Sequence, residues 1–202
     1  MKTLKIVSIG GGGLNAVNHM IDSGLTGAQF IACSTCEFDL QMSKAANNIW
    51  LDDGIIHGLD GSTVSRSEQA AIKSRDKILS AFDGADAIII VAGLGGFCGT
   101  GASPIVAQYA RELGALTIAV VTLPYRFEGP KRSARANVAV EKLSACTDAI
   151  IKIRNDKLLQ VVDKKTPLAK AFNIADEILL HAVRTLVSVF QNAFKINPVE
   201  FC

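Results

Sequence analysis

The stretch Ala92-Gly93-Leu94-Gly95-Gly96-Phe97-Cys98-Gly99-Thr100-Gly101-Ala102-Ser103-Pro104 decides how this chain folds. It follows the apolar run 87–91, whose length and β-branched residues are typical of a buried strand. It precedes a segment in which apolar residues return at helical spacing, beginning with Ile105 and Val106. The pattern predicts a strand, a glycine loop and a helix. We expect Pro104 in the first turn of that helix, where its missing N–H costs nothing.

The glycine content of this loop favours anion binding. Five glycines fall within the nine residues 93–101, which is more than a tight strand-to-helix turn requires. Bare backbone N–H groups and the positive end of a helix dipole attract an anion at such a loop. Phosphate is the anion that this pattern predicts, with a plain tight turn as the alternative.

Composition limits the class of protein. The 202 residues suit one domain with a full core. A net charge of +2 without a long basic run argues against a nucleic-acid-binding protein. Five scattered cysteines predict reduced, cytoplasmic thiols, and the Cys33/Cys36 pair lacks the second pair that a zinc site would need. Charges interrupt the apolar run 174–190, so no direct membrane insertion is expected.

A second strand, glycine loop and helix opens the chain. Residues 4–9 are predicted as a buried strand, and four glycines, 10–13, come directly after it. Alone, this unit resembles a dinucleotide-binding fold as much as any other phosphate site. An NAD(P)-linked oxidoreductase therefore stays open as one alternative. Its ribose-binding acid would have to be Glu37, which comes late after the next strand.

The remaining pattern predicts an α/β fold with a mainly parallel, Rossmann-like sheet and helices on both faces. A long, apolar helix near the C-terminal end is expected to be buried against the sheet. Ligands of such sheets bind at the carboxyl ends of the strands, where both glycine loops lie. Further strands are predicted at 30–33, 47–51 (an edge strand), 115–123 and 148–153, helices at 65–82, 132–143, 155–162 and 174–190, and a loop at 54–63.

Five segments resemble motifs of the FtsZ/tubulin family in the family's order. The resemblance as a whole runs from residue 4 to about residue 197, and five motifs in order are far more specific than one glycine motif. The segments are 10–18 (the first nucleotide loop), 92–104 (the signature loop), 121–129 with Arg132 (the ribose segment), and 154–159 and 171–176 (the guanine-facing segments).

The resemblance implies a guanine-nucleotide-binding domain that takes GDP or GTP, and it leaves open whether Mg²⁺ accompanies the nucleotide. Without the resemblance, each polar candidate has a plain structural alternative: a surface ion pair, a core ring, or an acid near a helix N-terminus. The implied roles are as follows: Gly11, Gly12, Gly13 and Asn15 line the nucleotide; Gly95 and Gly96 belong to the nucleotide-binding loop; Gly99, Thr100 and Gly101 cradle phosphate; Glu128 and Arg132 reach the ribose; Asn155 bonds the base or the sugar; Phe172 covers the base; Asp176 accepts hydrogen bonds from guanine N1–H and its amine.

Three departures from the family pattern gather where the γ-phosphate and the metal would lie. Phe97 and Cys98 stand where the family has Gly and Thr, and Ser34-Thr35-Cys36 replaces Asn-Thr-Asp, so the acid of that motif is absent. Residues 58–65 replace the loop that senses the terminal phosphate. We therefore expect GDP to be preferred to GTP, or bound equally, and Phe97→Gly to raise GTP affinity if the ring is the obstacle.

The segment after the long helix departs as well. The family carries a loop reading Asn-Leu-Asp-Phe-Ala-Asp there, whose acids position water on the nucleotide of the next subunit, and then a second domain. Here residues 196–202 hold Glu200 as the one candidate catalytic acid, next to Pro198. We expect a nucleotide-binding domain over 1–192, a short tail over 193–202, and weak GTP hydrolysis.

The first hypothesis is thus a guanine-nucleotide-binding protein of the FtsZ type that forms or regulates a cytoskeletal or cell-division filament. An active GTPase that assembles head to tail and hydrolyses GTP between subunits is the second hypothesis. The NAD(P)-linked oxidoreductase is the third, and the second glycine loop and Asp176 argue against it.

Overall fold

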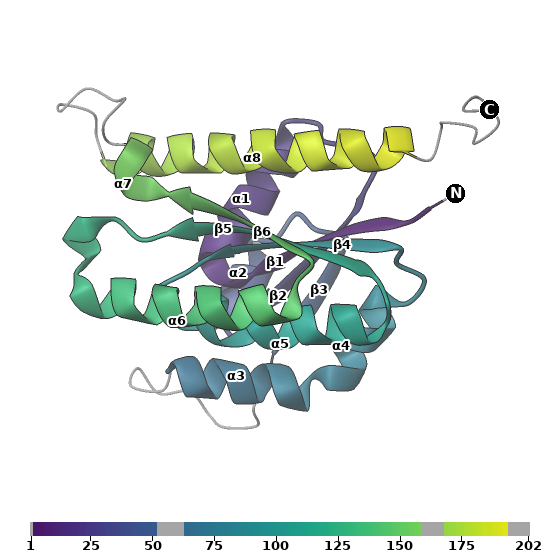
Figure 1. Ribbon diagram of the computed structural model, residues 1–202, viewed down its shortest axis with the longest axis horizontal. Coiled ribbons are helices and arrows are strands. Elements are labelled where there is room, and N and C mark those ends of the chain that lie inside the picture. Colours follow the sequence, from purple (N-terminus) through teal and green to yellow (C-terminus); the bar gives the residue numbers. More distant parts are fainter. Residues whose placement is uncertain (1, 52–62, 159–167, 194–202) are drawn as a thin grey trace.

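The computed structural model describes residues 2–51, 63–158 and 168–193. They form one six-stranded sheet in the order β3-β2-β1-β4-β5-β6, with every neighbouring pair parallel. Helices lie on both sides of it, with α8 on one side and α3, α5 and α6 on the other (Figure 1). The elements are β1 (Leu4–Ile9), α1 (Gly10–Asp22), β2 (Gln29–Ser34), α2 (Glu37–Gln41), β3 (Asn47–Trp50), α3 (Val64–Lys73), α4 (Arg75–Phe82), β4 (Ala87–Gly93), α5 (Cys98–Glu112), β5 (Leu116–Leu123), η1 (Arg126–Glu128), α6 (Pro130–Cys146), β6 (Ala149–Arg154), α7 (Asn155–Leu158) and α8 (Leu168–Ala193).

The strand order reverses between β1 and β4. From β1 the chain crosses over through α1 to β2, and from β4 it crosses through α5 to β5 in the opposite direction along the sheet. Right-handed crossovers in opposite directions place α1 and α5 on opposite faces. β1 and β4 are direct neighbours, with Ile9 paired to Ala92 at their carboxyl ends. This is the point of a doubly wound sheet at which ligands bind.

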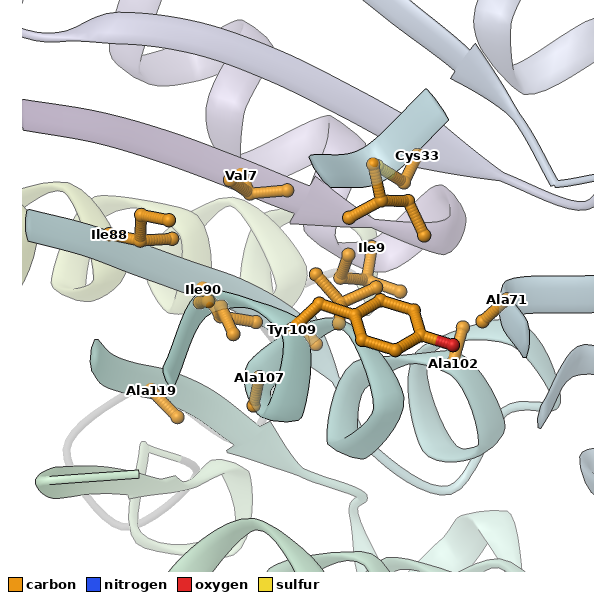
Figure 2. Close-up of a cluster of buried hydrophobic side chains, with 14 of the residues drawn as sticks. Val7, Ile9, Cys33, Ala71, Ile88, Ile90, Ala102, Ala107, Tyr109 and Ala119 are labelled. Atoms are coloured by element: carbon orange, nitrogen blue, oxygen red, sulfur yellow. The ribbon is translucent and has the colours of Figure 1, made fainter. Parts of the chain in front are cut away.

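Strand alternation builds a core on each face. Val7 and Ile9 of β1, with Ile88 and Ile90 of β4, face α3 to α6, and Figure 2 shows these side chains gathered around Tyr109 of α5. The intervening residues, such as Ile6 and Ile89, face α1 and α8. Because both faces are covered, these strands read as continuous apolar runs.

The predicted long helix is confirmed as α8, and its apolar stripe is buried. Leu179, Val183 and Val187, spaced four residues apart, are each no more than 3% exposed. They pack in the same core as α1 and the sheet. Burying a stripe of this kind, rather than helix propensity, stabilises such a helix. Among the helices that the structure describes, none has the length and apolar character needed to cross a membrane.

The predicted strands are all present within a residue or two of their expected bounds. The predicted helix 65–82 is wrong as a single element, because α3 ends and α4 begins at Ser74, where ψ is 14°. Ser74 is buried, and both helices keep apolar residues at helical spacing, so periodicity alone does not reveal the break. The loop at 54–62, the end of the helix at 159–162 and the tail from residue 194 lie outside the described residues.

The two glycine segments are more helical than predicted. α1 begins at Gly10, directly after β1, so no separate loop joins them. α5 begins at Cys98, so Gly99 and Gly101 are helical, and Pro104 lies in the second turn rather than the first. The prediction missed this because glycine disfavours helix interiors, and here close packing overrides that preference.

Candidate functional site

The N-termini of α1 and α5 meet at the carboxyl ends of β1 and β4. The first N–H groups of each helix, at residues 10–12 and 98–100, have no partner within their own helix. The two turns touch, because a Cβ placed on Gly10 would lie 3.0 Å from Cys98 Cβ and 3.1 Å from Gly99 N. Neither N-cap residue forms a side-chain capping bond, and neither first turn holds an acid. Two helix dipoles and several backbone donors are thus directed at one place, which suits an anion.

Several of the predicted glycines are required by packing. A Cβ on Gly13 would lie 2.3 Å from the carbonyl oxygen of Val91, and a Cβ on Gly99 would lie 2.4 Å from that of Gly93. Any side chain at these two positions would push α1 or α5 away from β4. The glycines therefore bring the helix N-termini close to the strand ends, which is how they serve the site.

Gly101 corrects the predicted phosphate cradle. Its N–H donates to the carbonyl oxygen of Phe97 at 2.9 Å, so this group is not available to a ligand. A Cβ on Gly101 would lie 2.2 Å from the carbonyl oxygen of Val64, at the start of α3. Gly101 is a helix-packing residue, because α5 begins earlier than the sequence suggested. Gly99 and Thr100 keep N–H groups that have no partner within the helix.

Two side chains, Thr100 of α5 and Arg135 of α6, hold the loop between β4 and α5 through Gly95. The Gly95 N–H donates to Thr100 Oγ1 at 2.8 Å, and the Gly95 carbonyl accepts from Arg135 Nε at 3.1 Å and Nη2 at 2.8 Å. The Phe97 ring centroid lies 4.9 Å from Arg135 Cζ, a cation–π contact. The ring that we expected to obstruct phosphate is therefore directed at α6. Of the two predicted loop glycines, Gly96 has open space around it.

Asp39, on the short helix α2 that follows β2, lies beside the N-terminus of α1. The sequence alone did not mark this acid as a site residue. Asp39 Oδ2 accepts a hydrogen bond from Ser34 Oγ at 2.7 Å. The other oxygen, Oδ1, lies 3.3 Å from where a Cβ on Gly11 would be. Its signal in the sequence is an acid one helical turn after Cys36.

Burial disfavours the charged form of two thiols near this end of the site, Cys98 and Cys33. Burial raises the pKa of the Cys98 thiol above its ordinary value, although contacts to Thr35 and Ser34 act in the opposite direction. Burial raises the pKa of Cys33 as well. Cys98 therefore adds no negative charge beside the helix N-termini. Within the described parts of the chain, no three His, Cys, Asp or Glu side chains form a ready metal site.

The two predicted ribose residues bind each other. One oxygen of Glu128 accepts from the Tyr125 N–H at 2.8 Å, and the other pairs with Arg132 Nη1. The Glu128 side chain is only 14% exposed, so the pair ties η1 to the first turn of α6. Arg132 is half exposed and keeps further guanidinium donors for a ligand.

The base-facing candidates come from the end of β6 and from α8, and one of them lies against the buried Tyr125 ring. The Phe172 ring meets Tyr125 edge-on at 5.4 Å and is 42% exposed. Asn155, at the end of β6, is 5% exposed, and its Oδ1 has no hydrogen-bond partner among the described residues. An orphaned, buried acceptor of this kind is costly unless a ligand or water satisfies it.

Asp176 is the third group at this end. Burial raises its pKa to about 6, with the nearby His19 acting in the opposite direction. Its charge also acts on Tyr125, which places it beside the aromatic cluster. No hydrogen bond joins the Asp176 carboxyl to another described side chain or backbone group. A half-buried carboxyl without a donor is a group prepared to accept one from a ligand.

Two further residues are predicted for the site, Asn15 and Glu200. Asn15 is exposed on α1, one turn beyond its glycine N-terminus. Glu200 lies outside the described residues. At the opposite, amino edge of the sheet, a cavity of about 610 Å³ lies between the strand ends and the last turns of α8. None of the predicted site residues lines this cavity.

Comparisons with known proteins give a consistent result. The model of the Tubulin/FtsZ family, GTPase domain, matches residues 3–163. A solved structure titled as an empty FtsZ dimer from M. jannaschii is 37% identical, with a TM-score of 0.87 over 94% of this chain and 55% of that chain. Two CetZ structures from Haloferax volcanii show the same fold at 20% identity. The GTPγS-bound CetZ2 protofilament has a TM-score of 0.79 over 94% of this chain and 59% of its own. The GDP-bound CetZ1 monomer has a TM-score of 0.77 over 90% and 58%.

Proposed function

The chain belongs to the tubulin/FtsZ family, and on that premise we propose that it binds a guanine nucleotide across the carboxyl edge of its sheet. It spans about 55% of the length of the FtsZ chain that it matches. The observation that carries the proposal is the meeting of the α1 and α5 N-termini at the carboxyl ends of β1 and β4. This place takes the phosphates, since it supplies backbone donors and two helix dipoles.

The other groups of the site match a guanine base. Guanine presents N1–H and an exocyclic amine on one edge, and the ionised Asp176 can accept from both. Adenine has no such pair of donors, so its binding would leave a half-buried carboxylate unpaired, which is costly. Asn155 offers an unsatisfied acceptor, and Phe172 offers an exposed aromatic face. We propose that residues 1–192 form the nucleotide-binding domain.

No observation favours the NAD(P)-linked oxidoreductase. Glu37, which would have to bind the ribose, is exposed on α2. The second helix N-terminus, at Cys98, lies beside the first and extends the phosphate site beyond one glycine loop. Both features fit the nucleotide site of a GTPase-domain fold.

We further propose that the chain hydrolyses GTP slowly on its own. Phosphoryl transfer relies on positioned groups and electrostatic stabilisation. Within residues 194–202 the one acid is Glu200. Two similar structures are titled as a dimer and a protofilament, which supports self-association of this chain. An assembling GTPase, with chains stacked head to tail, is therefore the rival hypothesis.

Nucleotide content tests the binding proposal first. The purified chain is denatured, and the released nucleotide is identified by chromatography. We expect GDP or GTP in near-equal ratio to protein. Release of an adenine or nicotinamide nucleotide would overturn the proposal, and an empty preparation would be followed by titration with GDP.

Phosphate release across protein concentrations separates slow hydrolysis from an assembling GTPase. We expect a rate per molecule that stays low and flat as the concentration rises. A rate that climbs with concentration and collapses in Glu200→Ala would establish the rival, in which one chain supplies the acid to the next.

A further inference from the structure

Asp39 occupies a position at the phosphate end that no family motif assigns to it. Its carboxylate is held by Ser34, a side chain only 1% exposed at the end of β2. Ser34 Oγ also accepts from the Cys36 N–H at 3.1 Å, so the turn between β2 and α2 fixes this hydroxyl. The Asp39 oxygens then lie 3.3 and 3.4 Å from the site of a Cβ on Gly11. The acid thus faces the first turn of α1.

This placement has an electrostatic consequence that depends on what is bound. In the free chain, the carboxylate is stabilised by the positive end of the α1 dipole. A nucleotide phosphate bound at the same turn brings a second anion close to the first, and like charges at short range repel. A divalent cation between the two would reverse the sign of the interaction. Mg²⁺ is commonly held by one or two carboxylates together with substrate phosphates and water.

We propose that Asp39 is the residue through which a divalent cation couples to the bound nucleotide, in place of the acid that is missing at Cys36. The inference rests on the proposed nucleotide site. Asp39 suits the role because carboxylate oxygen is the ligand type that Mg²⁺ prefers. Neighbouring side chains suit it less, since Cys98 is a protonated thiol and thiols favour softer metals.

Asp39 supplies the carboxylate oxygens that a cation would need beside the first turn of α1. Asp39 lies one helical turn after Cys36, and an α-helix returns to the same face in that interval. Asp39 Oδ2 accepts from Ser34 Oγ, and both carboxylate oxygens lie beside Gly11 in the first turn of α1. The acid therefore acts on phosphate or cation directly, while Ser34 acts through it as a positioning residue.

The decisive experiment crosses Asp39→Asn with removal of the metal. Nucleotide is stripped from the full chain, and the affinity for a non-hydrolysable GTP analogue is measured by calorimetry in Mg²⁺ and in EDTA. For the unmodified chain we expect Mg²⁺ to tighten binding by about tenfold or more. In Asp39→Asn we expect metal-free binding to tighten by about threefold to tenfold, because repulsion is removed, and the gain from Mg²⁺ to fall below about threefold.

Tighter metal-free binding by Asp39→Asn, together with a smaller gain from Mg²⁺, distinguishes this role from a structural one. The asparagine side chain has the shape of aspartate and can still bond to Ser34, so this substitution removes only the charge. A substitution that merely damaged the site would weaken nucleotide binding in both buffers. Glu37→Gln is the matched control, since it removes the same charge from an exposed position on the same helix and should change neither affinity. Ser34→Ala should give a partial loss of the Mg²⁺ effect.

Two outcomes overturn different claims. If Asp39→Asn binds the analogue with an unchanged Mg²⁺ dependence, or binds more weakly in both buffers, Asp39 does not couple the cation and this inference is wrong. If the unmodified chain binds no guanine nucleotide in either buffer, the proposed function itself is wrong.

Discussion

The phosphate end and the base end of the candidate site are built in different ways. At the phosphate end, backbone N–H groups of α1 and α5 point at the ligand, and glycines are held against strand carbonyls with no space for a side chain. At the base end, the working groups are the side chains of Asn155, Phe172 and Asp176, which are either unpaired or exposed. Packing makes the phosphate end rigid, whereas the base end keeps groups that can bond to a ligand.

This difference separates affinity from specificity. Backbone donors and helix dipoles recognise any phosphate, so the phosphate end alone would accept many nucleotides. The base end adds an acid and an amide. Their burial away from water costs free energy, and only a base with matching donors and acceptors offsets that cost. Substitutions at the two ends should therefore have different effects. Those at the phosphate end should destabilise the fold, and those at the base end should reduce discrimination between bases.

The largest effect is expected at the packed glycines. Gly99→Ala would place a Cβ 2.4 Å from the Gly93 carbonyl oxygen, against backbone that cannot move independently. We expect a loss of about 3 kcal/mol or more in the free energy of unfolding, measured by chemical denaturation. Gly96→Ala is the control, because a Cβ there meets nothing within 4 Å, and it should unfold like the parent chain. Equal stability of the two variants would contradict the packing account.

The next effect is the loss of base discrimination in Asp176→Ala. We expect GDP affinity to fall by about a hundredfold while affinity for ADP stays unchanged, because only guanine offers donors to the carboxylate. The raised pKa shows that the charged form is disfavoured in the free protein, so removing the carboxyl should not destabilise the fold at neutral pH. Calorimetry and thermal unfolding test the two halves. A variant that unfolds would contradict the idea that this acid is kept for a ligand.

The pKa of Asp176, about 6, gives a pH dependence to the base end alone. Below that pH the carboxyl is protonated and cannot accept from both guanine donors, so GDP affinity should fall by up to about tenfold per pH unit, while phosphate contacts persist. For stability the sign is opposite. The free native state holds this proton where the unfolded chain has lost it, so the contribution of Asp176 to stability decreases as the pH rises from about 4 to about 6.

Titrating GDP affinity in the parent chain and in Asp176→Asn checks the pH prediction. The decline toward low pH should be present in the first and absent in the second. A decline of equal size in both would assign the pH dependence to the phosphate end.

The smallest effect is expected at Phe97. Its ring packs on Arg135, away from the helix N–H groups, so Phe97→Gly should change the ratio of GTP to GDP affinity by less than about threefold. Arg135→Gln removes both bonds to the Gly95 carbonyl and should weaken the two nucleotides together by a few-fold. A tenfold gain in GTP affinity for Phe97→Gly would instead restore the view that the ring blocks the terminal phosphate.

The sequence predicts the framework of the site well and its details less well. Apolar runs and helical spacing locate every described strand and the long helix α8, because a sheet covered on both faces leaves a strong pattern. The same pattern cannot show that Gly101 packs on α3, or that Ser74 divides two helices. Those facts depend on contacts between segments far apart in the chain.

The contacts around Asp39 and Arg135 illustrate the same limit. The sequence shows an acid one helical turn after Cys36, but only the packing of β2, α2 and α1 shows that this acid, Asp39, lies beside Gly11. Likewise, Phe97 by itself predicts steric obstruction, and only the position of Arg135 on α6 shows where the ring goes. Motifs indicate which residues to examine, and tertiary packing decides which atoms remain available.

The central claim is that one edge of the sheet binds a guanine nucleotide through a backbone phosphate site and a side-chain base site. Calorimetry on the nucleotide-stripped chain, with GDP and ADP compared in one Mg²⁺ buffer at neutral pH, tests it most directly. We expect GDP to bind at least about a hundredfold more tightly than ADP. Equal affinity for the two would show that Asp176 and Asn155 do not read the base, and binding of neither would contradict the site itself.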